Sequence, residues 1–276
     1  MARPSGQQRW HFVLPFFYGK NRYVTGRGGA PVDRKVSFLA QTIASIADRF
    51  PGSDIIVTVC DEISVEKAGT VNRNVRQLAC PPLALPYATV KFAAEQLVEE
   101  LPADDIIVFN EDDQVLTISE IIVEDICRYG DSHFFSTHRW VRGEGGRRNR
   151  RAVRYRHKSV KGTIDNLYPD HPGTPCRLGC SYRVHTNRLS AYAACWATHV
   201  ATLKTIDFTE YEAKPELICL ETASYIILAT GIPVLKTDSA VESPGIFLAE
   251  HLSGYWYFKR RFSLSRLIRH LRTLRF

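Results

Sequence analysis

The sequence lacks the long apolar runs that would place the chain in a membrane. No stretch approaches the roughly 20 apolar residues that a membrane-spanning helix requires. Residues 1–8 are polar, contain Arg3 and have no apolar segment, so we expect no secretory signal peptide. These two absences predict a cytoplasmic protein, or one that lies peripherally on the inner face of a membrane.

Cysteines are few and irregularly spaced. Seven of them are scattered over 276 residues, and an odd number without a dense framework argues against a secreted disulfide scaffold. Cys176 and Cys180 form a close pair, but their spacing without a second pair is weak evidence for zinc. We therefore expect ordinary reduced thiols.

Acidic residues are scarce in two basic segments of the chain, whose formal net charge is +7. Seven Lys and Arg and no acids lie within residues 259–275, so this stretch alone equals the excess. A second basic run, at residues 139–161, is offset by acids elsewhere. A near-neutral body with two basic segments argues against a uniformly basic nucleic-acid binder, and we expect no nucleic-acid partner.

Hydrophobic patterning predicts an α/β fold. Continuous apolar runs are typical of buried parallel strands, and apolar residues three or four apart are typical of helices. The first half therefore has strands at residues 10–17, 54–60 and 105–110, and helices at 33–50, 87–101 and 119–129. This order implies an open, mostly parallel sheet with helices on both faces.

The second half is less regular. Its expected strands lie at residues 132–137, 179–185 and 233–236, and its expected helices at 187–198 and 215–230. Gly231 follows the second of these helices, where glycine is the preferred residue.

Acidic residues follow two of the expected strands. Asp61 comes directly after residues 54–60, and Glu111, Asp112 and Asp113 follow residues 105–110. Three consecutive carboxylates repel one another unless a cation or hydrogen-bond donors compensate them. Hard divalent ions bind such oxygen ligands together with substrate phosphates. A solvated acidic turn before a helix is the alternative interpretation.

Residues 10–120 resemble a GT-A-type glycosyltransferase, similar to family two. The resemblance rests on a first strand ending in Pro15, on DIIVTVCDE at residues 54–62 and on DIIVFNEDDQVL at residues 105–116. It implies one GT-A-like, Rossmann-related α/β domain over residues 1–258. It also implies transfer of a sugar from a nucleotide-sugar donor to a hydroxyl acceptor, such as a polysaccharide or a lipid-linked glycan precursor.

The resemblance also implies roles for the acidic residues. GT-A enzymes carry a D-x-D-type motif after the central strand, which this chain matches in the form E-D-D. Asp113 would then ligate Mn²⁺ or Mg²⁺ on the donor diphosphate, and Glu111 or Asp112 would face the ribose or the donor sugar. Asp61 would contact the base or the ribose.

Two later residues acquire roles from the same resemblance. Inverting members use an acid in a late helix as the general base on the acceptor hydroxyl, and Glu221 is the best candidate, followed by Glu216. The family often has a late histidine as a further metal ligand, and His251 occupies that place. A polar position on an amphipathic helix and a structural histidine are the alternatives.

Residues 259–276 are predicted to form a basic amphipathic helix. Its apolar side chains share one face, while most of the basic side chains project elsewhere. The apolar positions are Leu264, Leu267, Ile268, Leu271 and Leu274. Such a helix suits the surface of an anionic membrane, although packing on the body or on a partner would also explain it.

Three other classes of protein remain open. A nucleotidyltransferase has a related fold and a Gly-rich loop with basic residues after the first strand, which residues 26–29 resemble faintly. A non-catalytic nucleotide-binding or membrane-associated protein would tolerate loss of Asp113. A nucleic-acid binder would lose affinity steeply with salt.

Overall fold

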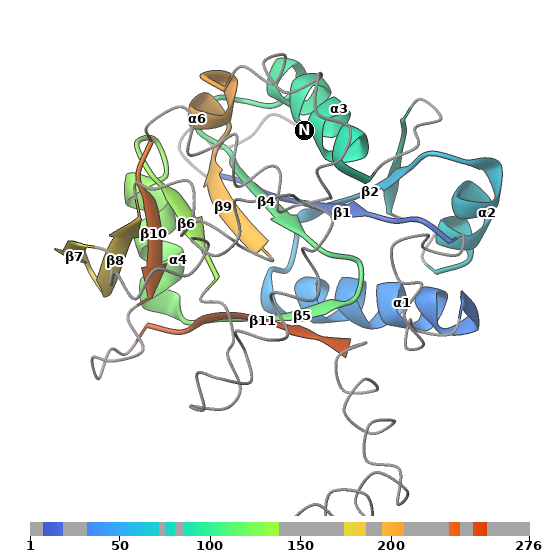
Figure 1. The fold of residues 1–276 in the computed structure, drawn as a ribbon, viewed down its shortest axis with the longest axis horizontal. Coiled ribbons are helices and arrows are strands. Elements are labelled where there is room, and N and C mark those ends of the chain that lie inside the picture. Colours follow the sequence, from blue (N-terminus) through green and yellow to red (C-terminus); the bar gives the residue numbers. More distant parts are fainter. Residues whose placement is uncertain are drawn as a thin grey trace, which may run out of the picture.

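The computed structural model describes residues 8–18, 32–71, 75–80, 86–137, 174–185, 195–206, 232–237 and 245–252. The first half contains β1 (Trp10–Pro15), α1 (Val32–Arg49), β2 (Asp54–Val59), α2 (Glu62–Val71), β3 (Arg76–Ala79), α3 (Pro86–Glu100), β4 (Ile106–Asn110), β5 (Gln114–Ile118) and α4 (Glu120–Tyr129). The second half contains β6 (Phe134–Ser136), β7 (Thr174–Arg177), β8 (Ser181–His185), β9 (Cys195–His199), α6 (Val200–Lys204), β10 (Val234–Thr237) and β11 (Phe247–His251). Figure 1 shows these elements along the chain.

A nine-stranded sheet runs through the described residues in the order β3-β2-β1-β4-β9-β6-β10-β8-β7. Strands β3, β2, β1 and β4 pair in parallel, and so do β6 and β10. Strand β9 is antiparallel to both β4 and β6, and β8 is antiparallel to both β10 and β7. All strands of this sheet except β8 and β9 therefore point the same way, which confirms the expected mostly parallel α/β sheet.

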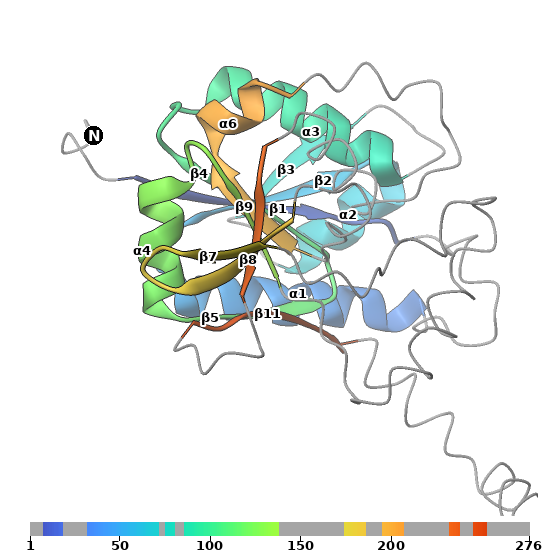
Figure 2. The same cartoon turned by 60° about the vertical axis from the view of Figure 1, so that its left-hand side comes forward.

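Helices cover both faces of this sheet, because successive residues of its central strands point to opposite sides. On β1, Val13 belongs to the core shared with α3 and α6, whereas Phe12 and Leu14 belong to the core shared with α1 and α4. Figures 1 and 2 show α3 and α6 on one side of the sheet and α1 on the other. The central strands are consequently buried on both faces and read as continuous apolar runs in the sequence.

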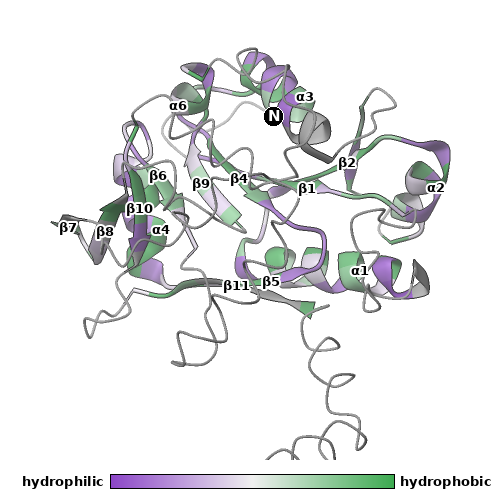
Figure 3. Cartoon of the chain, in the orientation of Figure 1, coloured by the Kyte–Doolittle hydropathy of each residue, from purple (hydrophilic) through white to green (hydrophobic). Residues whose placement is uncertain are grey.

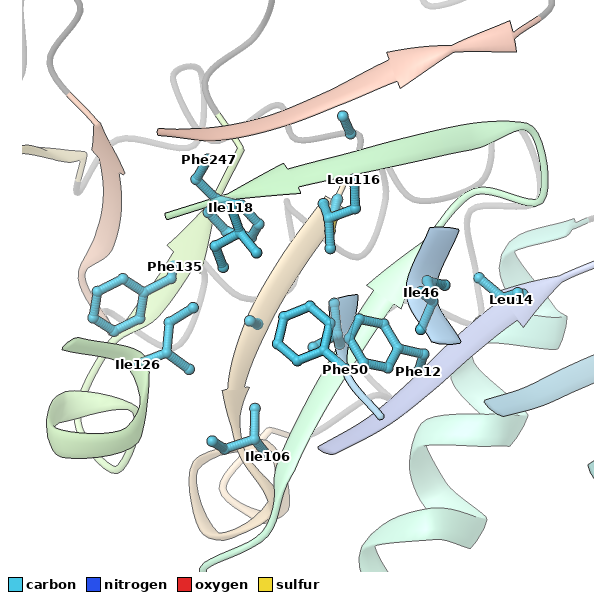
Figure 4. Close-up of a cluster of buried hydrophobic side chains, with 14 of the residues drawn as sticks. Phe12, Leu14, Ile46, Phe50, Ile106, Leu116, Ile118, Ile126, Phe135 and Phe247 are labelled. Carbon is cyan, nitrogen blue, oxygen red and sulfur yellow. The ribbon is translucent and has the colours of Figure 1, made fainter. Parts of the chain in front are cut away.

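Strand β5 leaves the main sheet directly after the acidic turn and pairs with β11 in a separate two-stranded sheet. This pair lies alongside α1 (Figure 1), on the same side of the main sheet. Its apolar side chains Leu116, Ile118 and Phe247 join the core that contains Phe12 (Figure 4). The acidic turn is thus held between two packed strands.

Helix α1 presents one apolar face to the sheet. Leu39, Ile43 and Ile46 recur at helical spacing and are buried there, and Phe50 packs just after the helix ends. Figure 3 shows hydrophobic and hydrophilic residues alternating along the same helix. The orientation of α1 fixes which of its polar side chains reach the ends of the strands.

A buried carboxylate anchors the hairpin formed by β7 and β8. Asp125 of α4 is buried and accepts hydrogen bonds from the Gly179 and Cys180 amides at 2.9 and 2.8 Å and from the Tyr182 hydroxyl at 2.6 Å. A Cβ atom at Gly179 would lie 2.5 Å from the Asp125 carboxylate, so the close approach requires glycine.

A second buried polar network lies at the amino ends of β1, β2 and β4. The ring of His11 on β1 is buried between two carboxylates, with Nε2 2.8 Å from Asp105 and Nδ1 3.3 Å from Asp54. Asp105 also accepts a hydrogen bond from the Arg9 amide at 3.0 Å. The hydrogen bond from His11 holds the pKa of Asp54 below its ordinary value.

Most of the predicted elements are confirmed within two residues at each end. The expected helix at residues 187–198 is wrong where the structure describes it, because Cys195–His199 forms the central strand β9. Ser119 stands at the N-cap of α4, but its hydroxyl accepts a hydrogen bond from the Ile246 amide at 3.0 Å instead of capping the helix. The helices predicted at residues 215–230 and 259–276 lie outside the described residues.

No disulfide joins the six cysteines in the described part of the chain. Among the helices that the structure describes, none combines the length and apolarity needed to cross a bilayer.

Candidate functional site

The carboxyl ends of β2, β1 and β4 meet at one edge of the sheet, in that order. Asp61 follows β2, Phe16 and Phe17 follow β1, and the turn Glu111–Asp113 follows β4. Ligands of open α/β sheets bind at this edge. The topology therefore brings together Asp61 and the acidic turn, which are about fifty residues apart in the sequence.

Neighbouring elements fix the backbone of the acidic turn. The Thr42 hydroxyl of α1 donates to the Asp112 carbonyl at 3.2 Å, and the Leu252 amide after β11 donates to the Asp113 carbonyl at 2.7 Å. Because both carbonyls are occupied, the two aspartates lie in a turn whose position is set by α1 and β11.

Two buried amides shape the same turn from within. Asn110 donates to the carbonyls of Glu111 and Gln114 at 3.2 and 3.3 Å. Gln114 donates from Nε2 to the Glu111 carboxylate at 3.1 Å, while its Oε1 accepts from the Glu111 amide at 3.3 Å. Glu111 is thus bonded back onto its own turn, which distinguishes it from Asp112 and Asp113.

Crowding of negative charge perturbs Asp112. Burial, the charge of Asp113 and that of Glu111 together raise the pKa of Asp112 to about 8, while Lys35 acts in the opposite direction. A cation bound beside Asp112 would oppose this shift and favour its ionised carboxylate. The turn therefore favours binding of a positive ion.

Lys35 supplies positive charge to this edge. Its ammonium donates to the Phe17 carbonyl at 2.7 Å and lies 5.4 Å from the centre of the Phe17 ring. Burial lowers the pKa of Lys35, and the charges of Asp112, Asp113 and Asp61 offset that effect only in part. The ammonium is accordingly half-buried among three carboxylates.

Asp61 has a structural role in the fold. One of its carboxylate oxygens accepts from the Ser64 amide at 2.8 Å and the other from the Ser64 hydroxyl at 2.7 Å. Asp61 therefore caps the amino terminus of α2, which begins at the next residue. Its predicted contact with a base or ribose stays a prediction.

The pairing of β5 with β11 determines where the backbone of His251 lies relative to the acidic turn. In this register His251 stands opposite Gln114, next to Asp113 in the chain. The backbone positions expected to supply the two metal ligands are therefore neighbours. The side chain of His251 and the whole of Glu221 and Glu216 lie outside what the structure describes, so their roles stay predictions.

Whether the acidic turn can bind a divalent metal ion depends on the side chains that it offers as ligands. Among the described residues, no group of three or more His, Cys, Asp or Glu side chains is arranged to hold a metal ion. Hard ions such as Mg²⁺ often use only one or two carboxylates together with substrate phosphates. Asp112 and Asp113 fit such a shared site, and the buried Asn110 Oδ1 beside them has no hydrogen-bond partner in the described structure.

Sequence reasoning missed Lys35, Thr42 and Gln114. A lysine on the polar face of an amphipathic helix resembles any solvated side chain, so no local pattern indicated it. Gln114 begins an alternating apolar stretch, QVLTI, which could have predicted a strand directly after the turn.

No protein family matches the sequence, and no curated protein matches it. The fold matches that of solved structures. A mannose-1-phosphate geranyltransferase from Thermus thermophilus is 12% identical, with a TM-score of 0.50 over 90% of this chain and 77% of that one.

Two further structures have lower scores. A glucosyl-3-phosphoglycerate synthase from Mycobacterium tuberculosis, in complex with Mn²⁺ and uridine diphosphate, is 12% identical, with a TM-score of 0.42 over 91% of this chain and 78% of that one. A 4-diphosphocytidyl-2C-methyl-D-erythritol synthase is 14% identical, with a TM-score of 0.42 over 84% of this chain and 91% of that one. These two scores support no conclusion about the present chain.

Together, the strand order and the Thermus match define the class of fold. The chain has a GT-A-type α/β fold, as the sequence resemblance implied. At 12% identity this match shows the fold alone.

Proposed function

We propose that the protein is a metal-dependent glycosyltransferase, which moves a sugar from a nucleotide-sugar donor to a hydroxyl acceptor. The observation that carries this proposal is the position of Asp112 and Asp113 at the carboxyl edge of a GT-A-type sheet, with Asp61 and Lys35 beside them. Crowded carboxylates at the ligand-binding edge favour a cation and, with it, an anionic ligand.

The donor side of the reaction follows from this arrangement. A bound Mn²⁺ or Mg²⁺ ion would neutralise the charge that develops on a leaving nucleoside diphosphate. Asp113 would hold the ion, with His251 as a further ligand on the neighbouring strand. Asp112 or Glu111 would orient the ribose or the sugar, and Asp61 would contact the base or the ribose.

The acceptor side rests on the sequence. Glu221 would accept the proton of the attacking hydroxyl, with inversion at the anomeric carbon. A polysaccharide or lipid-linked glycan is the proposed acceptor, because residues 259–276 suit an anionic membrane surface. The protein would then work in the cytoplasm, peripherally at the inner face of the membrane.

Nucleotidyl transfer is the second candidate. The placement of Lys35 favours it, because a cation at the end of β1 would also suit the triphosphate of a nucleotide substrate. The two reactions release different products. Nucleotidyl transfer to a sugar phosphate releases pyrophosphate, whereas glycosyl transfer releases a nucleoside diphosphate.

Thermal-shift screening of nucleotide sugars, with and without Mn²⁺, tests the donor site. Ligand at one hundred times its Kd stabilises the folded state by about 2.7 kcal/mol. We expect one nucleotide sugar to raise the melting temperature only when Mn²⁺ is present. Asp113→Asn should lose this shift, and Asp104→Asn, an exposed residue beyond the other end of β4, should keep it.

Each alternative outcome has a defined meaning. A shift that Asp113→Asn retains in full would remove Asp113 from the donor site. No shift with any nucleotide sugar, but one with a nucleoside triphosphate, would favour nucleotidyl transfer. Binding without release of a nucleoside diphosphate in the presence of acceptors would favour a non-catalytic nucleotide-binding protein.

A further inference from the structure

Lys35 lies near the middle of the acidic edge. Its ammonium is bonded to the Phe17 carbonyl at the end of β1, which is the strand between β2 and β4. Asp61 follows the strand on one side and Asp112 follows the strand on the other. Neighbouring strands are about 4.8 Å apart, so carboxylates flank the ammonium from both sides.

Anchoring α1 to β1 does not explain this placement. A lysine ammonium is strongly hydrated and loses that hydration when it is buried. The hydrogen bond to Phe17 could be made equally well from an exposed position. Lys35 is instead half-buried, with the carboxylates of Asp61, Asp112 and Asp113 acting on it. The negative charges of these carboxylates offset part of the cost of burying the cation.

The balance of charge indicates what Lys35 does at this edge. The single ammonium of Lys35 does not compensate all the negative charge that Asp61, Asp113 and the acidic turn can carry, and a divalent ion bound there would compensate more of it. A metal ion bound to the same carboxylates would be repelled by Lys35. Phosphate oxygens bound to that ion would be attracted by it.

We propose that Lys35 is a built-in counter-cation of the donor site, which weakens binding of the free divalent ion and strengthens binding of the nucleoside diphosphate that accompanies it. This inference rests on the proposed function, because it requires the edge to bind both groups. The metal ion and the nucleotide then bind together, and the site does not fill with metal alone.

Titration of the full-length protein with Mn²⁺ alone tests the first half of the inference. Electron paramagnetic resonance measures the free Mn²⁺ directly. Lys35→Met keeps the length of the side chain but removes its charge, and we expect it to bind Mn²⁺ about tenfold more tightly. Unchanged or weaker Mn²⁺ binding would overturn the inference. General structural damage does not produce the expected gain in affinity.

Calorimetry with UDP, GDP and CDP at saturating Mn²⁺ tests the second half. The nucleotide that the wild-type protein binds best should bind Lys35→Met about tenfold more weakly. Lys35→Arg retains the charge and should keep both affinities within about threefold. An arginine variant that behaves like the methionine variant would contradict a role based on charge.

One control variant separates this inference from a general effect of net charge. Lys91→Met removes a positive charge from α3, on the opposite face of the sheet, and should change neither affinity. An equal gain in Mn²⁺ affinity there would assign the effect to net charge and overturn the inference. Mn²⁺ binding that needs Asp113 but ignores Lys35 would refute the inference alone. Failure of the wild-type protein to bind any nucleotide in the presence of Mn²⁺ would refute the proposed function as well.

Discussion

Replacing Asp125 with alanine is expected to destabilise the protein strongly, because this buried carboxylate holds the hairpin of β7 and β8 against α4. Three donors would lose their acceptor: the amides of Gly179 and Cys180 and the hydroxyl of Tyr182. The side chain is almost completely buried, so water cannot readily replace it. The Cys180 amide and the Tyr182 hydroxyl, which belong to buried residues, then carry a desolvation penalty, whereas Gly179 is exposed.

The size of the effect follows from these contacts. A hydrogen bond to a charged group contributes about 1.5–3 kcal/mol, and loss of one partner of a buried charged group typically costs about 3–5 kcal/mol. We therefore expect a loss of about 3–5 kcal/mol for Asp125→Ala and about 1–2 kcal/mol for Tyr182→Phe. The double variant should lose less than the sum, because both changes remove the same hydrogen bond.

Urea unfolding followed by tryptophan fluorescence measures these free energies. Glu124→Ala, at the exposed neighbouring position on α4, is the matched control and should stay within about 0.5 kcal/mol of the wild type. A loss below about 1 kcal/mol for Asp125→Ala, or full additivity in the double variant, would refute the account of this anchor.

Three further predictions follow from the sequence and the structure. Glu221→Gln should lower turnover by roughly 10²-fold with donor binding intact, and a product with retained anomeric configuration by NMR would exclude the inverting mechanism. Because the pKa of Asp54 is lowered in the folded state, its ionised carboxylate stabilises the fold at pH values above 3.8, the ordinary pKa of this group. This contribution to the free energy of unfolding is lost as the pH falls through the lower pKa of the folded state. Asp54→Asn should therefore cost about 1 kcal/mol at pH 6 and flatten the loss of stability in acid, and an unchanged acid slope in urea titrations would contradict this. Truncation before Lys259 should abolish co-sedimentation with anionic vesicles while nucleotide-sugar binding persists, and indifference of the full-length protein to such vesicles at low salt would refute membrane docking.

The sequence predicted those helices and strands whose burial follows a regular pattern along the chain. Strands β1, β2 and β4 are buried on both faces, so their residues form the continuous apolar runs that parallel strands produce. Helices α1 and α4 bury one face each and show the corresponding period. Strand β9 is also buried on both faces, but its five residues CWATH alternate in polarity too little to distinguish a strand from the end of a helix.

The candidate site was predictable only where its residues are adjacent in the sequence. The acidic turn follows an apolar strand, so local pattern and chain order located it. Lys35 reaches the site because α1 packs against the sheet in one orientation, and that is a property of the tertiary structure. The ligand role of Asp61 stays a prediction, and the sequence did not indicate that its carboxylate also caps α2, a contact that depends on the helix beginning at the very next residue.

Release of a nucleoside diphosphate from a nucleotide sugar tests the central claim most directly. The wild-type protein would be incubated with a panel of nucleotide sugars, a glycan or lipid-linked acceptor and Mn²⁺, and the products identified by mass spectrometry. We expect one donor to yield a nucleoside diphosphate and a glycosylated acceptor. Chelation of the metal, or Asp113→Asn, should abolish both products, while Asp104→Asn should preserve them. Full activity of Asp113→Asn, or transfer that persists without divalent metal, would contradict the claim.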